Sequence, residues 1–314
     1  MSHGIIDQTY YKVTNENEIH FKFIYREGLN TLKGHFNDTG SCVAGGLYFT
    51  TLNHIHKFYD HGIYIREVTL PLDDPTFQVI KDVSGDKWRA NKIILGKRYS
   101  LFDLNTYKIL GLDITKHINL VDIASKFGNV PFLDSWKKSK IRLKYTNNSM
   151  DWASAFGRTD VLTWWLESGL KPKYSECAIT YASWFGHVKT LEWWHYSGQT
   201  LLYDEMALNW ATLRGHIKVL DWWIKRKLPM KYSSRIMVWA SNSGKPVVLD
   251  WWNKLFIMCS DFAIIWIIYK RIEMCNNNNI DQSADPVIKW WLNSGLIKAS
   301  VMQQIQQLLK NKFL

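Results

Sequence analysis

The sequence predicts two parts of different fold class, an α+β domain over residues 1–100 and an all-α helical repeat solenoid over residues 101–314. Two observations predict this division. Tryptophan doublets and columns of glycine and alanine recur every 29 residues in the second part, and the first hundred residues have no such period. A fixed period between 20 and 50 residues is the signature of stacked repeats.

The repeats are marked by paired tryptophans, which account for ten of the 17 tryptophans. The pairs are Trp164/Trp165, Trp193/Trp194, Trp222/Trp223, Trp251/Trp252 and Trp290/Trp291, and the first four are spaced by 29 residues. The last interval is 39 residues, and we expect the ten additional residues to include the polar run Asn276–Asn279. Large aromatic rings bury much apolar area per residue, so the favoured role of the doublets is packing between repeats.

Each repeat is predicted to be a pair of helices joined at a glycine. Gly157, Gly186, Gly215 and Gly244 lie seven residues before a doublet, and an alanine lies four residues before each of them. Apolar residues recur at helical spacing on both sides of the glycine. Gly169, Gly198 and Gly295 are expected to cap the second helix in a left-handed conformation. The predicted array begins with a capping half-repeat at 101–116. Full repeats follow from about residue 117, and a C-terminal cap covers about 285–314.

The pattern Ala-x-x-x-Gly-His-x-x-Val-Leu-x-Trp-Trp-x-x-x-Gly resembles the ankyrin repeat, with tryptophans in place of its paired leucines. Gly186-His187 and Gly215-His216 match the Gly-His turn of that family. The Thr-Pro-Leu-His opening is absent, and the unit is about four residues shorter than the 33 of the family. Short tryptophan-rich repeats behind an unrelated domain are similar to the ankyrin proteins of giant viruses of amoebae.

The resemblance implies a groove that binds a protein partner. In ankyrin repeats the residue before the phased alanine faces this groove, and residues one turn later vary for binding. An alternative is that the shortened repeats pull these side chains into the packing. Exposed aromatic residues with an occasional arginine are typical of binding hot spots. The candidate partner-binding residues are Trp152, Tyr181, Trp184, Phe185, Trp210, Leu213, Arg214 and Trp239.

The first hundred residues are predicted to form strands near Thr9–Val13, Ile19–Tyr25, Gly45–Thr50, Ile63–Pro71 and Arg89–Gly96, with a short helix over Asn53–Tyr59. One order of elements resembles the core of ADP-ribosyltransferases: the segment Gly-Gly-Leu-Tyr-Phe, then a helix, then a strand ending in Glu-Val. That resemblance implies a stacking role for Tyr48 and an acid role for Glu67. The early His/Arg motif of that family is missing, so a small domain with buried aromatic residues is the favoured interpretation.

The net charge of +11 is concentrated in the repeats. Residues 1–100 carry 12 Lys and Arg against 11 Asp and Glu, and residues 101–314 carry 27 against 17. The excess lies in Lys137–Lys144 and Lys225–Arg235. Some of it is helix capping, and the rest would attract acidic partners. Nucleic acid is the less favoured partner, because the basic clusters do not repeat with the 29-residue period.

The sequence therefore predicts a non-enzymatic protein that binds another protein. An ADP-ribosyltransferase-like N-terminal enzyme with a recruiting solenoid and a nucleic-acid-binding repeat protein are the alternatives. Cys42, Cys177, Cys259 and Cys275 have neither disulfide-framework nor zinc spacing. We expect an intracellular monomer without signal peptide, membrane segment, metal or cofactor.

Overall fold

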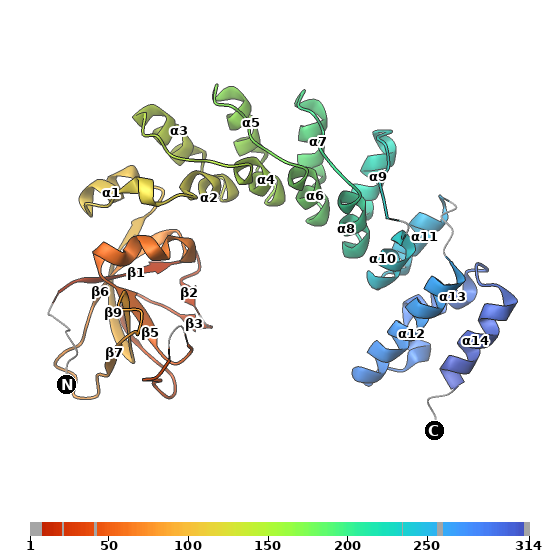
Figure 1. The fold of residues 1–314 in the computed structure, drawn as a ribbon, viewed down its shortest axis with the longest axis horizontal. Coiled ribbons are helices and arrows are strands. Elements are labelled where there is room, and N and C mark those ends of the chain that lie inside the picture. Colours follow the sequence, from red (N-terminus) through yellow and green to blue (C-terminus); the bar gives the residue numbers. More distant parts are fainter. Residues whose placement is uncertain (1–7, 21, 41–42, 234, 256–259, 311–314) are drawn as a thin grey trace. The chain divides into compact units, whose positions relative to one another are not determined.

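A computed structural model describes residues 8–20, 22–40, 43–233, 235–255 and 260–310 of the chain. By its contacts the chain divides into two compact units (Figure 1). The first comprises Met1–Ala124 and Asn129–Tyr145, and the second comprises Ser125–Gly128 and Thr146–Leu314. Cys42 and Cys259 lie outside the described residues, and the domain boundary at residue 100 stays a prediction.

The first unit is built on an antiparallel sheet of seven strands in the order β4-β9-β6-β1-β5-β8-β7. The strands are β1 (Tyr10–Thr14), β4 (Gly28–Thr31), β5 (Leu47–Thr50), β6 (Tyr64–Thr69), β7 (Val79–Lys81), β8 (Lys87–Ala90) and β9 (Lys92–Ser100). A 3₁₀ helix, η1 (Leu52–His61), packs against β1 through buried Ile55 and Tyr59. The core centres on Tyr10, Phe49 and Trp88, whose rings contact one another.

Two predicted strands of this unit are wrong in detail. The segment Ile19–Tyr25 forms a two-stranded ribbon, β2 (Ile19–His20) and β3 (Phe23–Ile24), because Lys22 has a left-handed backbone with φ of 65° that reverses the chain. The segment Arg89–Gly96 is divided at Asn91 between β8 and β9. The Asn91 amide donates to the carbonyl of Gln78, next to the β7–β8 pairing, and its carbonyl accepts from Leu32, next to the β4–β9 pairing. The chain therefore changes its neighbouring strand at this residue.

Helices follow the sheet from residue 104 onward. The first unit contains α1 (Leu104–Ile109), the 3₁₀ turn η2 (Ile114–Lys116) and α3 (Val130–Ser139), and α2 (Leu120–Lys126) spans the division between the units. The second unit stacks helix pairs: α4 (Asn148–Ala155), α5 (Thr159–Glu167), α6 (Cys177–Trp184), α7 (Val188–Tyr196), α8 (Met206–Arg214), α9 (Ile217–Lys225), α10 (Ile236–Asn242) and α11 (Pro246–Asn253). It ends with α12 (Asp261–Asn277), the 3₁₀ turn η3 (Gln282–Ala284), α13 (Pro286–Asn293) and α14 (Ala299–Lys310).

The helices of the second unit form two rows (Figure 1). The first helices of the pairs contact one another in succession from α4 to α12, and the second helices do so from α5 to α9 and from α11 to α13. The phased glycines have φ between 69° and 77°, and Gly169, Gly198 and Gly295 have φ between 70° and 73°. The predicted helix–glycine–helix repeat and its left-handed caps are confirmed.

The second tryptophan of each doublet fills the space between the two rows. Trp165, Trp194, Trp223, Trp252 and Trp291 are all at most 1% exposed. The indole Nε1 of Trp194 donates to Ser154 Oγ at 2.9 Å, and Trp252 donates to Thr212 Oγ1 at 2.9 Å. Trp165 and Trp291 bond in the same way to Ser125 and Ser241. Four of the five doublets are therefore tied to the first helix of the preceding repeat, whereas Trp223 Nε1 has no hydrogen-bond partner among the described residues.

The glycine turn is also covered by the next repeat. His216 Nε2 lies 2.8 Å from the carbonyl oxygen of Trp184, and Lys245 Nζ donates to that of Arg214 at 2.9 Å. These carbonyls end α6 and α8, where a positive charge or a donor is favourable. A Cβ at Gly215 would lie 2.5 Å from Lys245 Cδ, so this position needs glycine for space as well as for its φ of 73°.

Candidate functional site

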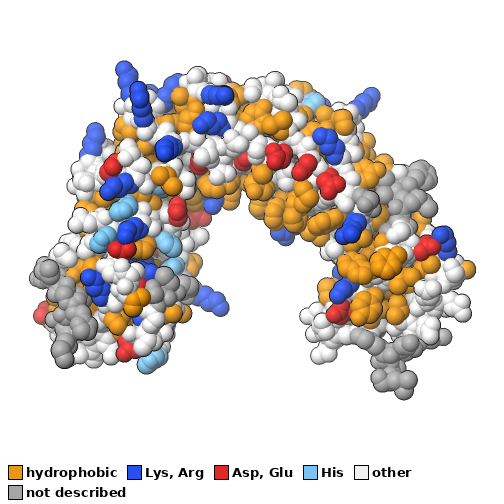
Figure 2. Space-filling model, in the orientation of Figure 1, with side chains coloured by type: hydrophobic (Ala, Val, Ile, Leu, Met, Phe, Trp, Pro, Cys, Tyr) orange, Lys and Arg blue, Asp and Glu red, His pale blue; other side chains and the backbone are white. Residues whose placement is uncertain are grey.

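Aromatic side chains gather on the first helices of the second unit. We call Trp152, Phe156, Tyr181, Trp184, Phe185, Trp210 and Trp239, which lie on or directly after α4, α6, α8 and α10, the aromatic band. Phe156 and Phe185 are 43% and 49% exposed, and the other rings are half-buried. Figure 2 shows hydrophobic side chains gathered over α4, α6 and α8, bordered by acidic side chains. The band therefore differs from the fully buried second tryptophans of the doublets.

The centre of the band is a stack of three rings and an arginine. The rings of Trp184 and Trp210 are parallel within 6°, with centroids 4.4 Å apart. Phe185 continues the stack at 5.6 Å from Trp184, and the guanidinium of Arg214 lies 5.4 Å from the centroid of the Trp184 ring. Stacked rings hold one another in place, which orders this part of the surface.

The remaining candidates lie around this centre. Trp239 meets Trp210 edge-on at 5.6 Å, and Tyr181 lies 6.5 Å from Trp184. Trp152 is further along the row, where Lys126 Nζ lies 6.0 Å from its ring and 4.9 Å from that of Phe156. Leu213 is half-buried on α8.

Sequence reasoning missed several exposed aromatic residues, among them Phe156, Trp266 and Tyr269 in the row of first helices. Phe156 stands four residues after Trp152, as Phe185 stands four after Tyr181, so the repeat phase could have found it. Trp266 and Tyr269, 41% and 49% exposed, lie on α12, which packs against α10. They were missed because the ten additional residues of the last repeat break the phase.

The residues of the ADP-ribosyltransferase alternative are not brought together. Tyr48 is on β5 and Glu67 on β6, and β1 lies between these strands. The Tyr48 hydroxyl bonds with the backbone of Val43 and accepts from Arg89, while Glu67 Oε1 accepts from the Tyr99 hydroxyl at 2.6 Å. This hydrogen bond raises the pKa of Tyr99 to about 12. Both side chains are thus held by structural partners.

The basic segments lie outside the aromatic band. Lysines 137, 138, 140 and 144 are exposed at and after the end of α3. In the other segment, Arg226 donates to Glu192 at 2.6 Å and Lys231 to the carbonyl of Tyr203 at 3.0 Å. Part of the charge of Lys225–Arg235 therefore connects neighbouring repeats.

The described residues contain no group of three or more His, Cys, Asp or Glu that could hold a metal ion. Over the same residues, no helix has the length and apolar character needed to cross a membrane.

The fold defines a helical repeat protein with aromatic side chains along the first helices of its pairs. The family model of ankyrin repeats (many copies) matches residues 150–194. Three similar proteins come from Acanthamoeba polyphaga mimivirus. "Putative ankyrin repeat protein R868" is 45% identical over 139 residues, which are 42% of this chain and 68% of that protein. "Uncharacterized protein R869" is 47% identical over 116 residues, 35% of this chain and 81% of that protein.

The third, "Putative ankyrin repeat protein R229", is 43% identical over 122 residues, which cover 34% of this chain and only 40% of that protein. The chain belongs to the ankyrin repeat family. The resemblance to the ankyrin proteins of giant viruses, inferred from the tryptophan-rich repeats, is confirmed.

Proposed function

We propose that this chain is a non-enzymatic protein that binds a segment of a partner protein on the aromatic band. The observation that carries this is the parallel stack of Trp184 and Trp210 with Arg214, on helices whose opposite faces are buried in the repeat core. Ankyrin repeats are in general protein interaction modules, and exposed tryptophan with arginine is the usual composition of a hot spot. Packing alone does not require a stack that leaves ring surface exposed.

The experiment compares the full chain with two variants in affinity capture from an Acanthamoeba lysate. Trp184→Ala with Trp210→Ala removes the centre of the band. Tyr196→Ala is the matched control, because Tyr196 is 69% exposed but lies on α7 in the other row. We expect the double variant to lose the partner that the wild type and the control retain, with all three equally folded by circular dichroism. Undiminished capture by the double variant would place the interaction elsewhere.

Two further assays separate this proposal from the alternatives. We expect no consumption of NAD by the full chain, since Tyr48 and Glu67 are held apart. We also expect weak, sequence-independent nucleic-acid binding that falls steeply with salt. Tight and sequence-selective binding that is lost on neutralising Lys137, Lys138, Lys140, Arg142 and Lys144 would favour the nucleic-acid function. We propose that the protein acts as a monomer inside the cell.

A further inference from the structure

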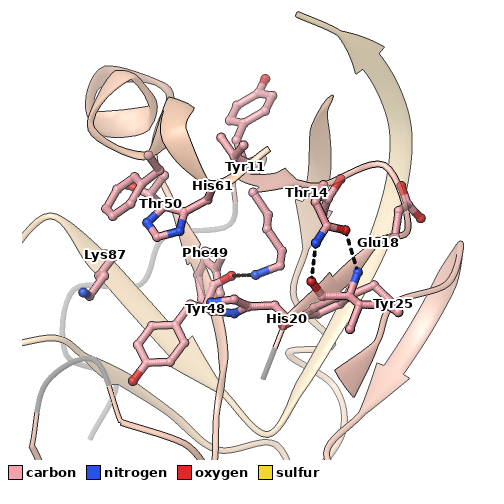
Figure 3. A pocket seen from close by; sticks show the side chains of 15 residues that line it. Tyr11, Thr14, Glu18, His20, Tyr25, Tyr48, Phe49, Thr50, His61 and Lys87 are labelled. Atoms are coloured by element: carbon pink, nitrogen blue, oxygen red, sulfur yellow. Dashed lines mark hydrogen bonds between the residues drawn. The ribbon is translucent and has the colours of Figure 1, made fainter. Parts of the chain in front are cut away.

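The first unit contains a cavity of about 180 Å³ between β1, the β2–β3 ribbon, β5 and η1 (Figure 3). It is separate from the aromatic band, since its lining residues fall between Tyr11 and Lys87. A cavity of about 150 Å³ holds one benzene molecule, so this one has room for a single substituted ring.

A buried lysine lines the cavity. Lys12 on β1 is 6% exposed, and its Nζ donates to the carbonyl of Tyr48 at 2.9 Å and lies 4.4 Å from the centre of the Tyr25 ring. Across the described residues no carboxylate forms an ion pair with it. Burial lowers its pKa to about 7. A buried ammonium group of this kind is stabilised by an anion.

The other polar groups of the lining do not supply that anion. His20 and His61 are basic, and burial lowers the pKa of both. Lys87 is basic too, and its Nζ lies 4.0 Å from Asp82 Oδ2. The carboxylate of Glu18 has Arg66 Nε at 3.5 Å and Arg98 Nη1 at 3.9 Å, so its charge is directed away from Lys12. Thr14 is 4% exposed, and its Oγ1 has no hydrogen-bond partner in the described part of the chain. The cavity thus offers donors and positive charge.

The remainder of the lining is flat and apolar. Tyr25, Tyr48, Phe49 and Phe58 contribute rings from β5, η1 and the segment after β3. Aromatic walls favour a planar ligand, which can stack or meet them edge-on. A ligand that combines a planar ring with one negative group matches both the walls and Lys12.

We propose that this cavity binds a small aromatic carboxylic acid, with its carboxylate on Lys12 and Thr14 and its ring among Tyr25, Tyr48 and Phe58. The site is independent of the partner-binding function, because all its residues belong to the sheet domain. The carboxylate of the ligand supplies a negative counter-charge to the ammonium group of Lys12, and the ring of the ligand fills the apolar remainder of the cavity.

The test is calorimetric titration of the full chain with benzoate at pH 7, with benzyl alcohol as the uncharged probe and inorganic phosphate as the probe without a ring. Benzoate is expected to bind at least tenfold more tightly than either. Lys12→Met, which keeps the length of the side chain, should weaken benzoate at least tenfold. Lys81→Met is the matched control, because Lys81 lies over Trp88 on edge strand β7 and does not line the cavity.

A second variant and a second readout keep the test decisive if Lys12→Met folds poorly. Thr14→Val should weaken benzoate several-fold. At pH 8 wild-type binding should take up protons, seen as a dependence of the heat on the ionisation enthalpy of the buffer. The other titratable groups facing Lys12 are Tyr11, Glu18, His20, Tyr25, Tyr48, His61 and Lys87, and the histidines, neutral at this pH, would take up little. Equal binding of benzyl alcohol, tight binding of phosphate alone, or unchanged benzoate binding by Thr14→Val without proton uptake would overturn the proposal.

Discussion

At the scale of the residue, the indole N–H groups of the doublets explain why the repeats use tryptophan. The family's leucine would fill the same space but could not satisfy the hydroxyl that follows each phased alanine. Ser125, Ser154, Ser183, Thr212 and Ser241 keep the 29-residue phase. Four of these five hydroxyls accept a hydrogen bond from a buried indole. Each bond gives a buried indole N–H an acceptor. The hydroxyls of Ser154 and Ser241 also donate to the carbonyls of Met150 and Met237.

Removing a hydroxyl that accepts an indole hydrogen bond should therefore lower the stability more than removing one that does not. Ser154→Ala leaves Trp194 Nε1 buried without an acceptor and should lower the free energy of unfolding by about 1–3 kcal/mol. Ser183→Ala is the control, because Ser183 Oγ and Trp223 Nε1 form no hydrogen bond within the described chain. It should cost less than Ser154→Ala in urea denaturation. Equal losses would show that the hydrogen bond contributes nothing beyond packing.

Lys227, shortly after the second helix α9, is a position where a substitution should raise the stability. Lys227 stands 29 residues after Gly198 and has the same left-handed backbone, with φ of 52° against 73°. A side chain in this region costs on the order of 1 kcal/mol that glycine avoids. Lys227→Gly should raise the free energy of unfolding by up to about 1 kcal/mol, and Gly198→Ala should lower it. A stability loss in thermal denaturation of Lys227→Gly would mean that the lysine side chain outweighs the strain.

At the scale of the element, the helices of the repeats were predictable and the small strands were not. The doublets, the glycines and the left-handed caps are local signals that recur, so each copy supports the others. The ribbon β2–β3 depends on one positive φ at Lys22, and the break at Asn91 depends on bonds to distant Gln78 and Leu32. Nothing in the local pattern of apolar residues marks either position.

The aromatic band and the cavity also differ in how far the sequence predicts them. The aromatic band could be predicted because Tyr181 and Trp210 keep the repeat phase. Its stacking geometry could not, since Trp184 and Trp210 are on neighbouring helices. The cavity was missed because Lys12 reads in sequence as an ordinary strand lysine. Only the sheet order, with β1 in the middle, buries it.

Burial of a histidine beside η1 predicts a loss of stability in acid. His117 is 4% exposed, stacks on Tyr59 at 4.5 Å and lies 3.1 Å from the Tyr107 hydroxyl. Burial lowers its pKa to about 4, while the unfolded chain titrates near the ordinary value of about 6.5. Between these values the unfolded state binds a proton that the folded state does not, so the free energy of unfolding falls as pH falls from 6.5 to 4.

The expected slope from His117 is about 1.4 kcal/mol per pH unit in that window. It can be measured by urea denaturation at pH 7, 6, 5 and 4. His20, whose pKa burial also lowers to about 4, adds to the same slope. His117→Gln removes one titrating group and should make the decline shallower. An unchanged slope in this variant would show that folding does not lower the pKa of His117.

At the scale of the whole molecule, the contacts between repeats depend on where each residue lies within its repeat and not on the number of residues between the two partners. The donor of each buried indole bond lies 40 residues after its acceptor, except for Trp291, where the interval is 50. The ten additional residues of the last repeat thus leave the bond in place, and they fall where α12 extends to Asn277 and η3 follows. The array therefore accommodates added residues where the indole donors and hydroxyl acceptors of neighbouring repeats still face each other.

Deletion of one whole period should therefore be tolerated. Removing the 29 residues Leu170–Gly198 takes out α6 and α7 and places Trp223 at the spacing that Trp194 had from Ser154. We expect a folded protein that unfolds cooperatively at lower denaturant, because stability in such arrays is a sum over repeats and their junctions. Removing the 20 residues Leu170–Lys189 breaks the phase and should abolish cooperative unfolding. Similar transitions for both deletions would refute a phase-dependent array.

The indole bonds also give four junctions of the array a reporter of their own. Donor and acceptor belong to different repeats, so a bond opens when either neighbour unfolds. The N–H proton of Trp194 can exchange with deuterium only when its own junction separates, and that of Trp252 only when another does. Their exchange rates, resolved by magnetic resonance, would show from which end the stack comes apart.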